Sequence, residues 1–236
     1  MVIIIGHRGA GGYLNENTAE SIKRALEMNV DAIEMDVRIC KTGEPILMHD
    51  ETLDRISNER GLISEKTLNE IKKITTLNGE KIITLKEGLN IINRKVNVVI
   101  ELKEKDSVFP VAKIIQDYID AKGWKEDDFA IISFRKKALL ELRKLNSKIR
   151  LALLLRLPII PMRFAKKVNL FAVGLHHRAL RKRFIKKAHE NNILVFVWAG
   201  DKEERLEKIK TTTDVDGIIS FYPDKIHSPK TFKNTP

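Results

Sequence analysis

Residues 32–50 read AIEMDVRICKTGEPILMHD, and this stretch decides how many strands the central sheet of the chain has. It contains two apolar runs of strand type, at 32–37 and 46–48, joined by only a few polar residues. A crossover between parallel strands needs about a dozen residues or more, so the second run must return antiparallel to the first. We therefore expect a hairpin that turns at Thr42-Gly43.

Outside this hairpin, short apolar runs alternate with amphipathic stretches of helical periodicity. The other expected strands are 2–5, 96–102, 130–133, 150–155, 171–175, 193–198 and 217–220, and the expected helices are 17–28, 84–94, 108–122, 136–145, 161–167, 179–191 and 202–210. Such alternation predicts βα units on a parallel sheet. Without the returning arm of the hairpin eight strands remain, so we expect an α/β protein, a single (β/α)8 TIM barrel over 1–236. An open, doubly wound sheet is the alternative fold.

Two segments stand outside the regular alternation. Residues 51–81 follow the hairpin and contain a short helical pattern at 68–74. We interpret them as a small insertion after the second strand, above the barrel mouth, where barrels of this type vary. Residues 227–236 are rich in Lys, Pro and Thr, which is typical of a flexible tail. We therefore expect one domain with one insertion and a flexible C-terminal tail.

The composition restricts the class of protein. The chain has 236 residues, 43% of them hydrophobic and 32% charged, so it can bury a large core and is not expected to be disordered. No apolar run is long enough to span a membrane, and signal-peptide features are lacking, so we expect a soluble, cytoplasmic protein. The single cysteine, Cys40, excludes an internal disulfide and a cysteine-rich zinc site, and we expect it in the core.

The charge balance is basic, with 43 Lys and Arg against 32 Asp and Glu and a formal net charge of +11. A basic surface attracts nucleic acid, anionic lipid headgroups and phosphorylated small molecules alike. A nucleic-acid groove would interleave basic residues with aromatic ones. The basic peak at 178–187 offers only Phe184, so we expect no nucleic-acid partner. Transient contact with an anionic membrane surface stays open.

Functional groups in such a barrel lie where the strands end, at the C-terminal face. The polar and bulky residues at these positions are His7, Arg8, Glu34, Asp36, Glu101, Lys103, Arg156, His176, Trp198 and Phe221. Glu34 and Asp36 are two apart on one strand and face the same side, with Met35 on the other. Three carboxylates at one mouth repel each other unless a cation lies between them. Hard oxygen ligands suit Mg²⁺ or Ca²⁺, so we expect one divalent metal ion there.

The hairpin brings a second histidine to this acidic cluster. If Thr42 and Gly43 are the two central turn residues, Asp36 lies opposite His49; a one-residue slip would change the partner but not the neighbourhood. Asp50 follows at once, and a carboxylate there orients the imidazole and favours its charged form. Two histidines on either side of a metal and a guanidinium are suited to act as acid and base in breaking a phosphate ester.

Short motifs in a fixed order run through nearly the whole chain. They are His7-Arg8-Gly9, Asn15-Glu16-Asn17-Thr18, Glu34-x-Asp36, His49-Asp50, Thr52-Leu53-Asp54-Arg55, Glu101-Leu102-Lys103, Ile132-Ser133-Phe134, Val197-Trp198, Gly217-Ile218-Ile219 and Tyr222-Pro223-Asp224. As an ordered set they resemble the glycerophosphodiester phosphodiesterase family. The resemblance implies a TIM barrel with an insertion after the second strand. It also implies metal-dependent hydrolysis of glycerophosphodiesters to glycerol phosphate and an alcohol, in lipid and glycerol metabolism.

The resemblance also implies roles for individual residues. These are general acid and base for His7 and His49, metal ligands for Glu34, Asp36 and Glu101, and phosphate contacts for Arg8 and Lys103. Trp198 and Phe221 are bulky residues at the ends of the last two strands, where we expect the glycerol or headgroup of the substrate to rest. The attacking group is either water or the neighbouring glycerol hydroxyl.

Three other functions are open alternatives. The same chemistry could act on lysophospholipids presented at an anionic membrane surface. A nucleic-acid phosphodiesterase would use the +11 charge, although no basic and aromatic groove is evident. A barrel that binds the metal and phosphate without catalysis would be expected to lack His7 or His49, and both are present.

Overall fold

The computed structural model describes residues 2–199, 209 and 214–226. Eight parallel strands form the centre of this part: β1 (Ile3–Gly6), β2 (Ala32–Ile39), β4 (Asn97–Leu102), β5 (Phe129–Ser133), β6 (Arg150–Leu155), β7 (Ala172–His176), β8 (Leu194–Ala199) and β9 (Gly217–Ser220). They pair in chain order, and β1 pairs with both β2 and β9. This pairing closes the sheet. The (β/α)8 barrel is confirmed, and the open, doubly wound sheet is excluded.

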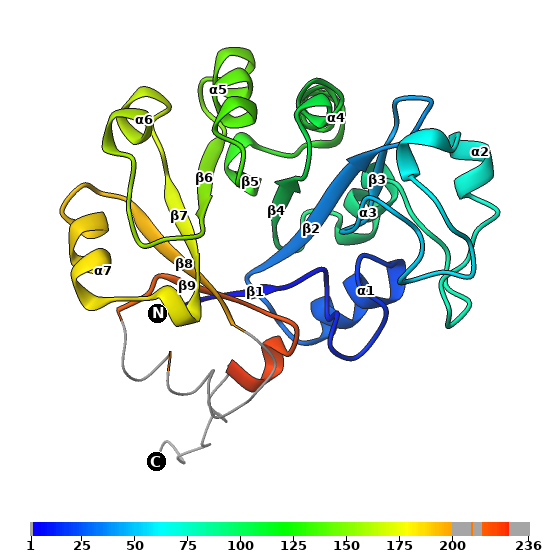
Figure 1. The fold of residues 1–236 in the computed structure, drawn as a ribbon, viewed down its shortest axis with the longest axis horizontal. Coiled ribbons are helices and arrows are strands. Elements are labelled where there is room, and N and C mark those ends of the chain that lie inside the picture. The colour runs from blue at the N-terminus through cyan, green and yellow to red at the C-terminus, as the bar shows by residue number, and fades with distance from the viewer. Residues whose placement is uncertain (1, 200–208, 210–213, 227–236) are drawn as a thin grey trace.

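Helices surround the barrel on its outside (Figure 1). They are α1 (Ala19–Glu27), α3 (Leu85–Ile92), α4 (Val108–Lys122), α5 (Lys136–Leu145), α6 (Met162–Lys167) and α7 (Lys182–His189), with α2 (Leu68–Ile71) in the segment after the hairpin. The 3₁₀ turns are η1 (Ile63–Glu65), η2 (Lys105–Ser107), η3 (Glu126–Asp128), η4 (His177–Ala179) and η5 (Pro223–Ile226). The helix expected at 202–210, apart from Ile209, and the tail expected at 227–236 lie outside the described residues. Within the described ranges, no helix has the length and apolar character needed to cross a membrane.

Local sequence signals fix the ends of α1 and α3. Thr18 and Thr84 cap these helices, because each side chain accepts a hydrogen bond from the backbone N–H three residues on. The side chains of the residues at those positions, Ser21 and Glu87, in turn accept a hydrogen bond from the backbone N–H of the threonine. These reciprocal pairs are capping boxes. Asn93 ends α3 in a left-handed conformation, with φ of 45°.

The barrel strands separate two apolar layers. Side chains that point outward, such as Met35 of β2, join the large core under the helices. Side chains that point inward form a smaller cluster inside the barrel: Ile5, Ala32, Val99, Ala130, Ile132, Ala152, Leu154, Ala172, Phe196 and Ile219. Since side chains alternate along a strand, Glu34 and Asp36 face the barrel interior, as expected from their spacing around Met35.

The hairpin is present, but its register differs by one residue from the prediction. The strand β3 (Pro45–Leu47) runs antiparallel to β2, and the backbone N–H of Met48 donates to the carbonyl of Asp36. The turn holds three central residues instead of two, and Gly43 adopts a φ of 93°, which glycine does without steric strain. Asp36 is therefore opposite Met48, and His49 lies one residue further along.

Residues 51–81 pack against the hairpin and lie on the outer side of β3 (Figure 1). Their buried apolar side chains form a small separate core with those of the hairpin: Cys40, Ile46, Met48, Leu53, Ile63, Ile71, Ile74 and Ile82. Cys40 is buried, as expected. The helix α2 in this segment is shorter than the predicted 68–74 pattern. The segment thus adds a second layer beside the hairpin that carries His49.

Candidate active site

A pocket of about 490 Å³ opens at the C-terminal ends of the strands. Residues expected in the site line it: His7, Arg8, Glu34, His49, Glu101, Lys103 and Trp198. Ile132, Leu154 and Ile219 of the barrel interior supply much of its apolar wall. Asp36 is fully buried beside Arg8 and Lys103, and Phe221 lies against His7. The strand ends therefore bring the nine expected residues together.

The carboxylates of Glu34, Asp36 and Glu101 form a buried cluster in which one oxygen of each lies within 4.8 Å of the others. Asp36 on β2 and Glu101 on β4 are register partners in the sheet. Lys103 Nζ lies 2.8 Å from Asp36 Oδ1 and 2.9 Å from Glu101 Oε1. Glu34 Oε1 has no hydrogen-bond partner among the described residues.

The pKa shifts of these carboxyls show a shortage of positive charge. Burial raises the pKa of Glu34 well above its ordinary value, and the charges of Asp36 and Glu101 add to the shift. Burial also raises the pKa of Glu101. Burial acts in the same direction on Asp36, but Lys103 and Arg8 outweigh it and hold the pKa of Asp36 below its ordinary value. Asp36 is therefore a paired anion, while the other two carboxyls lack a sufficient counter-charge.

This donor set fits a hard divalent cation. Mg²⁺ and Ca²⁺ bind carboxylate oxygens, and buried charges need either a partner or a metal. The unpartnered oxygen of Glu34 and the raised pKa values of Glu34 and Glu101 are what a missing positive charge produces. The buried triad with Asp36 could therefore hold a metal ion.

The backbone turns at Arg8 and comes close to this cluster. Arg8 has a φ of 54°, a left-handed conformation that costs roughly 1–2 kcal/mol for a residue other than glycine. Its backbone N–H donates to Glu34 Oε2 at 3.0 Å, which helps to hold that conformation. Gly9 follows with a φ of 78°, and a Cβ there would lie 2.6 Å from the backbone of Ser21. Glycine is therefore required for this turn to pack against α1.

The guanidinium of Arg8 reaches from this turn into the acidic cluster. Its Nε lies 3.0 Å from Asp36 Oδ2, and its Nη1 donates to Glu16 Oε1 at 2.8 Å. Its central carbon lies 5.3 Å from the centre of the Phe221 ring, within cation–π range. Burial disfavours the charge, but Asp36 and Glu16 outweigh it and raise the pKa of Arg8. The result is a fixed, fully charged donor at the pocket wall.

His7 is held by stacking. Its ring lies on Phe221 with centroids 4.2 Å apart, and its Nε2 is 3.9 Å from Glu34 Oε2. Burial, followed by the charge of Arg8, lowers the pKa of His7 to about 3. The imidazole is therefore neutral at neutral pH and can accept a proton.

His49 is held by Asp50, whose Oδ1 lies 2.6 Å from His49 Nδ1. The expected orienting contact is confirmed. The hydrogen bond to Asp50 does favour the charged imidazole, but burial and the charges of Lys103 and Arg8 outweigh it and lower the pKa of His49. The net shift of the pKa is thus opposite to the one that Asp50 alone predicts, because burial of the ring acts on His49 first and the cations that face the pocket add to it.

Asn17 is a site residue to which the sequence analysis gave no role. Its Nδ2 donates to Asp36 Oδ2 at 3.0 Å, and its Oδ1 accepts the backbone N–H of Asp36 at 3.1 Å. Asn17 is buried and has a φ of 60°. One of these hydrogen bonds holds the carboxylate of Asp36 and the other holds its backbone. Only its place in a motif pointed to Asn17, because its partner is 19 residues away.

Glu16 and Arg55 complete a chain of charges that links the two sides of the pocket. Glu16 Oε1 accepts from Arg8 at 2.8 Å and from Arg55 Nη2 at 2.5 Å. Arg55 Nε donates to Asp50 Oδ2 at 2.5 Å, and Asp50 holds His49. The guanidinium of Arg55 therefore connects the turn after β1 to the histidine after the hairpin.

We expect Arg55→Gln to lower kcat by about 10-fold while metal affinity is kept, because Asp50 loses the partner that fixes its second oxygen. Steady-state kinetics and a metal titration measure the two effects. Arg60→Gln, which removes an exposed cation from the same segment, is the control and should behave as wild type. An unchanged kcat in Arg55→Gln would show that the hairpin holds His49 without this link.

The remaining candidates lie around the pocket. His176 accepts the backbone N–H of Arg178 at 3.3 Å, and its ring lies 6.2 Å from that of Trp198. His177 is not among the pocket-lining residues. Arg156 lies over the ring of Phe134 at 5.9 Å, beside the pocket rather than in it. Neither histidine enters the acidic cluster.

A closed barrel whose mouth joins buried carboxylates, two cations and two histidines is typical of enzymes that hydrolyse phosphate esters. The model of the glycerophosphoryl diester phosphodiesterase family matches residues 7–225. The chain belongs to this family, and it is a phosphoric diester hydrolase.

Similar proteins cover nearly the whole chain. A glycerophosphodiester phosphodiesterase of Caldanaerobacter subterraneus is 29% identical and covers 95% of this chain and 96% of its own length. The crystal structure of a glycerophosphodiester phosphodiesterase from Agrobacterium tumefaciens has a TM-score of 0.82 at 26% identity, covering 96% and 99% of the two chains. A phosphodiesterase from Oleispira antarctica, in complex with the product sn-glycerol-3-phosphate, has a TM-score of 0.86 at 22% identity and covers 94% of each chain.

Proposed function

We propose that the enzyme hydrolyses glycerophosphodiesters to glycerol phosphate and an alcohol, using one divalent ion, Mg²⁺ or Ca²⁺, and two histidines. The observation that supports this proposal is the pocket, whose walls include His7, His49, Arg8 and Lys103 and which adjoins a buried carboxylate triad with too little counter-charge. The family match supports the substrate class. The glycerol phosphate bound to the Oleispira antarctica protein supports the product.

The cations of the pocket suit a phosphodiester. The substrate carries one negative charge that repels nucleophiles, and more charge develops in the transition state. Arg8 and Lys103 would bind the phosphate oxygens, at a site buried enough for these contacts to be strong. A divalent ion held by Glu34, Asp36 and Glu101 would add positive charge at the same phosphate.

The two histidines have environments suited to different roles. His7 is neutral and mostly buried, so we assign it the role of accepting the proton of the attacking water or glycerol hydroxyl. His49 is half-exposed and hydrogen-bonded to Asp50, which favours its charged form. A bound phosphate would favour that form further, so we assign His49 the delivery of a proton to the leaving alkoxide.

Trp198 and Phe221 should affect the substrate in different ways. Trp198 lines the pocket, so Trp198→Ala should change the relative rates across a panel of headgroups. Phe221 contacts His7 and Arg8, so Phe221→Ala should lower kcat on every substrate by about 10-fold as well as alter the pocket rim. If both variants keep the wild-type relative rates across the headgroup panel and only melt at a lower temperature, the two rings have a packing role alone.

Product analysis tests the proposed function. Purified protein with Mg²⁺ or Ca²⁺ is incubated with glycerophosphodiesters, lysophospholipids and nuclease substrates, and the phosphate products are identified by ³¹P NMR. We expect glycerol phosphate from the glycerophosphodiesters at the highest rate. Faster turnover of a lysophospholipid, or of a nucleic acid, would overturn this substrate assignment.

A further inference from the structure

A second hollow adjoins the active-site pocket on one side. It has a volume of about 1040 Å³ and lies over the ends of β4, β5 and β6, three neighbouring strands of the barrel. The two hollows share Glu101, Lys103, Phe134 and Leu154 in their walls. A substrate whose phosphate lies at Lys103 can therefore extend one of its arms directly into the second hollow.

The rim of this hollow is strongly basic. Arg135 and Lys136 follow β5, and Arg156 follows β6, so successive strand ends each add positive charge beside Lys103. Among the described residues that line the hollow, Glu101 is the one carboxylate, and Lys103 already pairs with it at 2.9 Å. In the part of the chain that the structure describes, none of these three added cations forms an ion pair.

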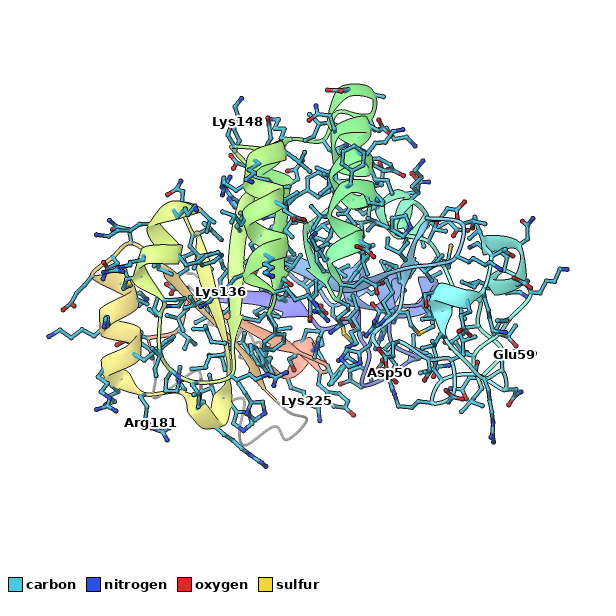
Figure 2. The ribbon with its side chains drawn as sticks, turned by 45° about the horizontal axis from the view of Figure 1, so that its top comes forward. Asp50, Glu59, Lys136, Lys148, Arg181 and Lys225 are labelled. Atoms are coloured by element: carbon cyan, nitrogen blue, oxygen red, sulfur yellow. The ribbon has the colours of Figure 1, made fainter. Side chains whose placement is uncertain are left out.

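Two other cations on the same side of the barrel form ion pairs. Lys105 lies 3.3 Å from Glu141, and Lys148 lies 3.7 Å from Glu126. Figure 2 shows Lys136 at the inner end of α5 and Lys148 beyond its outer end. The three cations at the rim of the hollow have no such partner among the described residues, so they create a positive potential next to the reaction centre.

Aromatic rings and backbone hold these cations toward the hollow. The guanidinium of Arg156 lies 5.9 Å from the ring centre of Phe134, and Lys136 Nζ lies 5.8 Å from that of Phe164. Arg135 Nε donates to the carbonyl of Lys103 at 2.7 Å. The helix α5 also begins here without a side-chain cap, so its N-terminal N–H groups add to the positive potential.

We propose that this hollow is an anion subsite, which binds a second negatively charged group on one arm of the phosphodiester substrate. The inference rests on the proposed function and deepens it, because it names the substrate class as glycerophosphodiesters with an anionic headgroup. The group is a phosphate or a carboxylate, since both accept charge-assisted hydrogen bonds from Arg and Lys. A cationic headgroup such as choline is repelled there.

Steady-state kinetics on matched substrates test the subsite. The reference substrate is glycerophosphoglycerol, whose headgroup is uncharged. The test substrates carry a terminal phosphate or a carboxylate on that headgroup, and glycerophosphocholine supplies a cation. We expect the wild type to have a KM about 10-fold lower for the terminal phosphate than for the reference, and a lower KM for the carboxylate as well. This preference should weaken in 0.5 M salt, because the Debye length there is roughly half of its value in physiological salt and charges are screened more strongly.

Substitutions test which residues form the anion subsite. Lys136→Gln with Arg156→Gln should remove most of the KM preference for anionic headgroups and change the KM for glycerophosphoglycerol much less. Lys148→Gln, at the other end of α5, removes the same charge and should keep the preference. Melting curves confirm that each variant is folded, and Arg156→Gln alone is the fallback if the double variant is unstable.

The outcomes separate the two claims. Equal KM values for neutral and anionic headgroups in the wild type would overturn the anion subsite while leaving the proposed function intact. Preference for the phosphate alone would assign the subsite to a second phosphate, and preference for both anions would assign it to negative charge in general. Failure to hydrolyse any glycerophosphodiester would overturn the proposed function first.

Discussion

Alanine at His7 or at His49 should lower kcat by on the order of 100-fold or more, with metal affinity largely kept. Both histidines line the pocket. Neither is one of the three residues that we expect to hold the metal, which are all carboxylates. The loss of a proton-transfer group affects the transition state and spares the ground-state metal site. Release of glycerol phosphate gives kcat, and calorimetric titration with Mg²⁺ or Ca²⁺ gives the metal affinity.

The double variant makes this test sharper. Groups that act as a unit are not additive, so His7→Ala with His49→Ala should lose much less than the product of the two single losses. His189→Ala is the matched control, because His189 pairs with Asp216 at 2.8 Å and does not line the pocket. Near wild-type kcat in either single variant would remove that histidine from the acid and base roles.

The pH profile follows from the same assignment. Burial and the pocket cations lower the pKa of both imidazoles in the protein without substrate, so both are neutral near pH 7. A bound phosphate anion favours the protonated form of His49, so kcat, which reports the enzyme–substrate complex, should follow a bell-shaped curve. Protonation of His7 should cause the loss on the acid side. The His49→Ala variant should lose the alkaline limb, and a flat profile in the wild type would contradict the paired roles.

Glu34→Gln, Asp36→Asn and Glu101→Gln should each weaken metal binding by about 100-fold or more, because each removes one anionic ligand from the triad. Metal titration of each variant measures the loss. Glu141→Gln, on the outer face of α5, neutralises an exposed carboxylate and is the control. Metal affinity at the wild-type level in all three variants would place the ion elsewhere.

The same variants should differ in the stability of the metal-free protein. The raised pKa of Glu34 means that its charged form is disfavoured in the fold, so Glu34→Gln should raise the melting temperature by a few degrees. The pKa of Asp36 is lowered by Lys103 and Arg8, so Asp36→Asn removes the carboxylate that these two cations share. Among the described residues, Lys103 then keeps only Glu101 and Arg8 only Glu16, and the change should destabilise the protein by up to roughly 3–5 kcal/mol. Melting curves in chelator should therefore move in opposite directions for these two variants.

Periodicity and connection length were enough to predict the barrel, because each strand and each helix carries its own local signal. The short link between 32–37 and 46–48 excluded a crossover and so identified the one antiparallel arm. The register of that hairpin was predicted wrongly by one residue. The sequence Thr42-Gly43 suits a two-residue turn, and the left-handed Gly43 also closes the three-residue turn that the structure has. The choice depends on the packing of Met48 and Ile46 against residues 51–81.

The strand-end rule located the acidic triad, His7, Arg8 and Lys103, because parallel strands deliver their final residues to one face of the barrel. The hairpin argument added His49. Neither could find Glu16, Asn17 or Arg55. These residues lie in loops, and their roles depend on contacts over 19 and 39 residues of sequence. The lowered pKa of His49 was also beyond a local pattern, since burial, its largest cause, and the charges of Lys103 and Arg8 all depend on the tertiary fold.

The most direct test of the central claim is the release of glycerol phosphate from glycerophosphoglycerol by chelator-treated protein, before and after a divalent ion is added back. Without an ion, Lys103 and Arg8 do not supply enough positive charge for the three buried carboxylates of Glu34, Asp36 and Glu101. We therefore expect no release from the stripped protein, with activity restored by Mg²⁺ or Ca²⁺ and not restored in Glu34→Gln. Full activity in the metal-free protein would contradict the account.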